Sequence, residues 1–109
     1  MVKTRTYGNL YLIGNANIRK VGGYNRLENL MLSEGIDYEK DSISSSFPKF
    51  GGGEVYRTED GKIIITSYSR GVNPRFLPIK EIYVYRLYVM SENDFEKVKS
   101  KLNFTPLSN

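Results

Sequence analysis

The sequence predicts a single small α+β domain, and three observations support this class. Two segments, residues 24–34 and the segment that starts at residue 91, place apolar side chains at helical spacing. Short runs rich in Val, Ile and Tyr alternate with Gly, Asn and Asp, as strands and turns do. The predicted order is β-β-α-β-β-β-α, which favours an antiparallel or mixed sheet with two helices packed on one face. We assign residues 1–104 to this domain and residues 105–109 to a short C-terminal tail.

The first part of the chain is predicted to hold two strands and a helix. Residues 2–7 alternate like an edge strand, and residues 10–13 form a short apolar run after the turn residues Gly8 and Asn9, so the two could pair as a hairpin. A loop is expected over residues 15–23. The helix over 24–34 has an apolar stripe, an Asn25 to Glu28 spacing that resembles a capping box, and a glycine directly after it.

The middle of the chain is predicted to be a long loop followed by a hairpin. Residues 36–53 are rich in Ser and acids, and we expect no regular structure there; loops of this length are often functional. Residues 54–58 and 62–69 are β-rich and flank the dipeptide Asp60-Gly61, which is a strong hairpin signal.

The last part is predicted to hold a basic loop, a strand and a helix. Residues 70–78 form the loop, and residues 79–90 are dense in Ile, Val and Tyr, which favours a strand. The helix is expected to begin after Ser91, whose side chain can cap it. Acidic residues occupy its first turn and lysines its end, an arrangement that suits the helix dipole.

Two absent residue types limit the chemistry of these 109 residues. The sequence has no Cys and no His, so Ser–His or Cys–His catalysis and cysteine-ligated zinc cannot be assembled within it. We therefore expect no enzyme, no cofactor and no metal site. No apolar run approaches the length of a membrane span, and the start lacks the pattern of a secretory signal. A cytoplasmic protein without a membrane partner is expected.

Charge is separated along the sequence, although the net charge is only +4. Residues 1–26 carry five cations and no acid, residues 27–60 carry eight acids and three cations, and residues 61–90 carry five cations and one acid. This separation suggests one basic surface and one acidic surface, and a basic surface attracts polyanions.

Tyrosines interleaved with arginines are the strongest functional pattern. Aromatic rings can stack on bases while guanidinium groups contact phosphates, which suits single-stranded nucleic acid. Tyrosine is also a common strand residue that packs in cores, so the pattern has a structural interpretation as well. The predicted nucleic-acid-binding residues are Arg19, Lys20, Arg70, Arg75, Arg86, Tyr68, Tyr83 and Tyr85.

The strand over 79–90 predicts a further partner. Alternation puts Val84, Arg86 and Tyr88 on one face and Tyr85 and Leu87 on the other, so both faces hold apolar or aromatic residues. Two short helices cover one face, and the other must meet the long loops, a partner or a second copy, which makes a homodimer an expectation.

The leading functional hypothesis is a non-enzymatic, basic nucleic-acid-binding domain. The alternative is a protein-binding module or inhibitor, for example a viral or mobile-element protein that acts on a host factor. A catalytic arrangement of Glu54, Asp60 and Lys62 is weaker, because Asp60-Gly61 is already explained by a hairpin turn.

Overall fold

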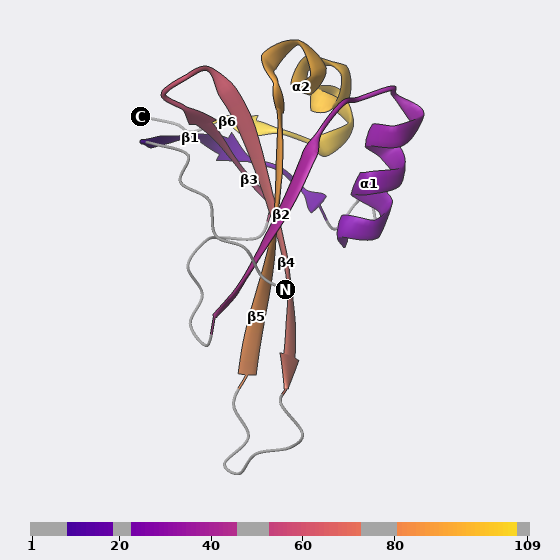
Figure 1. Cartoon of the computed structure of the whole chain (residues 1–109). Coiled ribbons are helices and arrows are strands. Elements are labelled where there is room, and N and C mark those ends of the chain that lie inside the picture. Colours follow the sequence, from indigo (N-terminus) through magenta and orange to yellow (C-terminus); the bar gives the residue numbers. More distant parts are fainter. Residues whose placement is uncertain (1–8, 19–22, 46–52, 73–80, 107–109) are drawn as a thin grey trace.

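Six strands of the computed structural model form one antiparallel sheet in the order β2-β5-β4-β3-β1-β6 (Figure 1). The structure describes residues 9–18, 23–45, 53–72 and 81–106, so the predicted strand over 2–7 and its hairpin lie outside the described residues. The elements in chain order are β1 (Leu10–Asn15), α1 (Gly23–Ser33), β2 (Glu39–Ser45), β3 (Glu54–Thr58), β4 (Lys62–Val72), β5 (Glu81–Ser91), α2 (Glu92–Lys99), the 3-10 turn η2 (Ser100–Leu102) and β6 (Thr105–Pro106). The predicted α+β class and single small domain are confirmed.

The hairpin predicted at Asp60-Gly61 joins β3 to β4. Gly61 has a φ of 85°, in the left-handed region that favours glycine. The hydroxyl of Thr58 donates to Asp60 and accepts from the backbone N–H of Lys62 at 2.9 Å, which ties the two ends of the turn together. The turn therefore holds β3 and β4 in the register Val55↔Ile65.

Helix α1 ends as predicted but begins earlier than its cap signal indicates. At its end, Gly35 has a φ of 71°, and the N–H of Ile36 donates to Met31 O at 2.9 Å, which is a Schellman termination. At its start, the helix already includes Gly23, so Asn25 lies within the first turn. The Glu28 carboxylate points to the sheet instead, where it accepts a hydrogen bond from Tyr88.

Helix α2 begins where the sequence predicts it. Ser91 is the N-cap residue, and its hydroxyl oxygen accepts from the backbone N–H of Asp94 at 3.2 Å. Met90 before the cap and Phe95 after it are both buried in the main core, as a hydrophobic staple requires.

Strand β2 corrects the prediction of an irregular stretch over residues 36–53. Residues 39–45 pair with β5 from Glu39↔Val89 to Ser45↔Tyr83. This pairing uses backbone N–H and C=O groups, which a Ser- and acid-rich composition does not reveal. Among the described strands, β2 lies at one edge of the sheet, where charged residues are common because they discourage further pairing. In the same way, β4 runs through Arg70 to Val72, which the sequence assigned to a loop.

The main core lies between the two helices and one face of the sheet. Leu27 and Met31 of α1 and Val98 of α2 are fully buried there against strand residues that include Ile65 and Tyr88. Both predicted helices therefore pack on the same face, as expected from the sequence.

The opposite face of the sheet has a second, smaller cluster. Ile64, Leu87 and Val89 are buried there, and none of the described members of the cluster belongs to a helix. The predicted alternation along β5 is confirmed, because Tyr88 belongs to the helix-covered core and Leu87 to this second cluster. These residues are already buried within one copy of the chain. Their burial needs no second copy, and the homodimer stays a prediction.

The molecule is elongated, with principal extents of 46 × 31 × 28 Å. Figure 1 shows the helices near one end and the far ends of β4 and β5 at the other. Thr105 and Pro106, which the sequence places in the tail, pair with β1 through Gly14↔Pro106, and residues 107–109 lie outside the described ranges. In the described ranges, neither α-helix has the length and apolar character needed to cross a membrane.

Candidate functional site

The β4–β5 arm, defined as residues 67–72 paired with residues 81–86, is the part of the sheet that extends from the core. β4 and β5 pair without a break from Lys62↔Ser91 to Val72↔Glu81. β3 pairs only with residues 63–65 of β4. On the other side, β2 reaches as far as Tyr83. The arm thus ends in a two-stranded ribbon whose last pairs, Gly71↔Ile82 and Val72↔Glu81, have no third strand among the described residues.

Tyr68 and Tyr85 form an aromatic pair within this arm. They are register partners on adjacent strands, and their ring centroids are 5.5 Å apart at an interplanar angle of 34°. Tyr85 is fully buried, whereas Tyr68 is 44% exposed. The two rings therefore lie side by side on one face of the sheet, and Tyr68 is the ring that solvent reaches. This differs from the prediction that both rings face a ligand, because burial leaves only one of them accessible.

The remaining predicted residues of this region are described only in part. Arg70 and Tyr83 are register partners in the same ladder, two residues beyond the Tyr68–Tyr85 pair. Arg75 lies in residues 73–80, and Arg19 and Lys20 lie in residues 19–22, all outside the described residues. The prediction of a continuous basic face is therefore not tested at those positions.

Arg86 lies on the opposite face of the sheet from Tyr68 and Tyr85. Its register partner is Ser67, next to the Tyr68–Tyr85 pair, and alternation along β5 points it to the helix-covered side. There its Nη1 donates to Oε2 of Glu28 on α1 at 3.2 Å. The structure does not bring Arg86 together with Tyr68, although the sequence places both in one binding surface.

Glu28 is the centre of a polar cluster that joins α1 to two strands. Its Oε2 also accepts from the Tyr88 hydroxyl at 2.8 Å and lies 3.4 Å from Nζ of Lys40 on β2. The ring of Tyr88 is further packed edge-on against Tyr38, with centroids 5.7 Å apart. We call Glu28, Lys40, Arg86 and Tyr88 the Glu28 cluster.

The protonation behaviour of the Glu28 cluster follows from these contacts. Burial raises the pKa of Glu28, but the hydrogen bond from Tyr88, the charge of Lys40 and the hydrogen bonds from Lys40 and Arg86 outweigh it, so the pKa lies below its ordinary value. Burial and the bond to Glu28 raise the pKa of Tyr88. Glu28 is therefore ionised and Tyr88 is a hydroxyl donor at neutral pH.

Sequence reasoning missed this cluster for a definite reason. Glu28 has the spacing of a capping residue relative to Asn25, and Lys40 lies in a segment read as a loop. The available signal was the helical spacing, which puts Glu28 next to the buried Leu27 and one turn before Met31. A carboxylate at that position borders the core and needs a partner.

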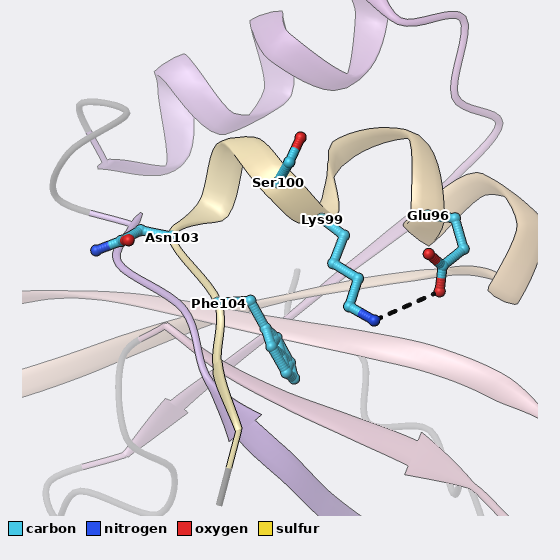
Figure 2. A pocket seen from close by; sticks show the side chains of 5 residues that line it. All are labelled: Glu96, Lys99, Ser100, Asn103 and Phe104. Carbon is cyan, nitrogen blue, oxygen red and sulfur yellow. Dashed lines mark ion pairs between the residues drawn. The ribbon is translucent and has the colours of Figure 1, made fainter.

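A surface hollow of about 540 Å³ lies where α2 meets β6 (Figure 2). Phe104 is in edge-to-face contact with Phe95, and Nζ of Lys99 lies 5.5 Å from the centroid of the Phe104 ring. Lys99 also pairs with Glu96 at 3.7 Å. The two charged side chains that line the hollow therefore pair with each other. The lining residues are Glu96, Lys99, Ser100, Asn103 and Phe104.

The residues of the weaker catalytic hypothesis do not converge. Glu54 begins β3 and accepts from the Tyr56 hydroxyl at 2.9 Å, whereas Asp60 lies in the turn after the strand and accepts from Thr58. The two carboxylates are therefore at opposite ends of β3. Among the described residues, no group of three or more His, Cys, Asp or Glu side chains is placed to hold a metal ion.

No protein-family model matches this chain, and a search of curated proteins and of solved structures found no significant similarity. The fold and the contacts described above are therefore the basis for any functional inference.

Proposed function

We propose that this protein binds nucleic acid, in single-stranded form, through the β4–β5 arm. The observation that carries the proposal is the Tyr68–Tyr85 pair, in which a buried ring supports a ring that is 44% exposed. A base has a flat aromatic face whatever its identity, so an exposed, supported tyrosine can stack on it without reading sequence. The buried Tyr85 reduces the freedom of Tyr68, which lowers the entropy lost on binding.

The sequence that connects the two strands of the arm supports the same ligand. Residues 70–80 contain Arg70, Arg75 and Lys80 and no acid, and the first acid after them is Glu81 at the start of β5. Arg70 follows Tyr68 by two residues on β4, and its register partner is Tyr83. Cations next to a stacking ring can contact the phosphates that flank a stacked base.

The test compares variants of Tyr68 in binding to a labelled single-stranded oligonucleotide, followed by fluorescence anisotropy. Tyr68→Ala should weaken binding by about 1–3 kcal/mol, the usual contribution of one stacked base, and Tyr68→Phe should retain it because the ring remains. Tyr11→Ala is the matched control, since Tyr11 is an exposed tyrosine on β1, away from the arm. Equal affinity of Tyr68→Ala and Tyr11→Ala would argue against the proposal.

The alternative function is protein binding. It is favoured by the position of β2 at the edge of the described strands, because a partner chain can add a strand to a sheet edge. A salt series separates the two functions. For a single-stranded ligand, the logarithm of the affinity falls with the logarithm of salt by about 0.7 for each phosphate contacted. Arg70→Gln should reduce that slope by about one contact. A salt-independent affinity, or no binding at low salt, would favour the protein-binding alternative.

A further inference from the structure

The Glu28 cluster has the donor arrangement of an oxyanion site. Three donors from two adjacent strands converge on a single oxygen: the Tyr88 hydroxyl at 2.8 Å, Arg86 Nη1 at 3.2 Å and Lys40 Nζ at 3.4 Å. Tyr88 and Lys40 are register partners, and Arg86 precedes Tyr88 by two residues on the same face of β5. The strand ladder thus fixes the donors, while the acceptor comes from a helix. Arginine, lysine and hydroxyl donors are those that bind phosphate oxygens.

The acceptor can leave without moving the helix that carries it. Leu27 and Met31 hold α1 in the core and are fully buried, whereas the Glu28 side chain is 21% exposed. Lys40 and Arg86 are 45% and 29% exposed, so the cluster opens to solvent at the surface. Rotation of one flexible side chain would therefore clear the acceptor position, because the two strands and the helix are fixed by separate contacts.

The charges in the cluster suit a phosphate better than a carboxylate. Glu28 brings one negative charge to two cations, whereas a free phosphate or a phosphate monoester carries about −1.5 to −2 near neutral pH, and every phosphate group has several acceptor oxygens. A phosphate could accept from Arg86 and Lys40 on different oxygens, which a single Oε2 cannot do. Tyr88 remains a donor at neutral pH without Glu28, because burial alone raises the pKa of its hydroxyl.

We propose that Arg86, Lys40 and Tyr88 form a phosphate-binding site that the Glu28 carboxylate occupies in this structure and vacates when a phosphate group binds. The site lies on the helix-covered face of the sheet, away from Tyr68. It does not depend on nucleic-acid binding by the β4–β5 arm, and inorganic phosphate is the ligand that tests it.

The experiment measures phosphate affinity by isothermal titration at constant ionic strength for the natural chain and three variants. Glu28→Ala should bind phosphate at least about tenfold more tightly than the natural chain, a difference of about 1.4 kcal/mol, because the internal competitor is gone. Glu34→Ala is the matched control. It removes one carboxylate directly after helix α1, and that carboxylate pairs with Lys101, whose Nζ lies 2.5 Å from Oε2 of Glu34. It should show no such gain. Glu28→Ala combined with Arg86→Gln should lose the gain.

If Glu34→Ala increased the affinity for phosphate as much as Glu28→Ala does, the proposal would be overturned, since the loss of one negative charge would then explain the higher affinity. If Glu28→Ala does not fold, the natural chain decides the question by NMR. Phosphate should then shift the amide signals of Glu28, Lys40 and Arg86 along one binding curve, and no shift would overturn the proposal. A parallel titration with a single-stranded oligonucleotide identifies the source of the phosphate group. If Glu28→Ala also binds the oligonucleotide more tightly, the ligand is a backbone phosphate. If its affinity rises for inorganic phosphate alone, the ligand is a free anion.

Discussion

The hydroxyl of Tyr88 on β5 donates a 2.8 Å hydrogen bond to Oε2 of Glu28 on α1. The two residues are 60 positions apart in the sequence, and their contact is where the first helix meets the centre of the sheet. Tyr88 is fully buried, so its hydroxyl depends on this acceptor.

Tyr88→Phe should lower the free energy of unfolding by about 1.5–3 kcal/mol, the usual contribution of a hydrogen bond to a charged group. The ring is kept, so packing against Tyr38 is unchanged and the loss reports the hydroxyl. Urea denaturation measures it as a lower midpoint at constant slope. Tyr11→Phe removes an exposed hydroxyl and should change stability by less than about 0.5 kcal/mol. Equal effects of the two changes would contradict the role of the Tyr88–Glu28 bond.

The stabilisation of the fold by Glu28 should be present at neutral pH and should be lost only in acid. The pKa of Glu28 in the folded protein lies below its ordinary value of 4.5, so the unfolded chain binds the proton more readily. The stabilisation is therefore complete above pH 4.5, and it is lost as the pH falls through the lower pKa that Glu28 has in the folded protein. Glu28→Gln should be less stable than the natural chain at neutral pH, and the difference should shrink as the pH falls below 4.5. A stability difference that stays constant over that acid range would show that the charge of Glu28 is not what stabilises the fold.

Gly53→Ala should be far more damaging than Gly61→Ala, although both glycines have positive φ, at 79° and 85°. A Cβ at Gly53 would overlap the carbonyl oxygen of Ala16, whereas nothing lies within 4 Å of the same position at Gly61. Gly61→Ala should cost about 1–2 kcal/mol for the left-handed conformation alone. Gly53→Ala adds a backbone clash and should cost about 3 kcal/mol or more. Thermal unfolding followed by circular dichroism compares them, and similar melting temperatures would contradict the close approach at Ala16.

Ser91→Ala should lower the free energy of unfolding by about 1 kcal/mol, because the N–H of Asp94 loses the oxygen that caps α2. Ser91→Asp should retain most of the stability, since aspartate also caps helices well. Ser100→Ala, at an exposed position after the helix, is the control and should stay within about 0.5 kcal/mol. If all three variants had the same midpoint of urea denaturation, the Ser91 cap would have no role in stability.

The sequence by itself determined the elements whose signals are local. The Asp60-Gly61 hairpin, the Ser91 cap and the glycine after α1 each depend on residues a few positions apart, so their chemistry can be read directly from the chain. Alternation along β5 also assigned Tyr88 and Leu87 to opposite faces, because side chains alternate in any strand.

Only the tertiary structure decided which residues meet across the fold. Strand β2 forms because its backbone pairs with β5, and that pairing does not depend on an apolar sequence. Arg86 looked like a ligand-binding cation next to tyrosines, but the packing of α1 on the sheet gives it Glu28, which is 58 positions away. Tyr68 and Tyr85 looked alike in the sequence. In the sheet, β5 has a strand on each side at Tyr85, whereas β3 does not reach Tyr68 on β4, and the first ring is buried while the second is exposed. Burial and long-range partners depend on the whole fold, because they arise only when distant segments pack together.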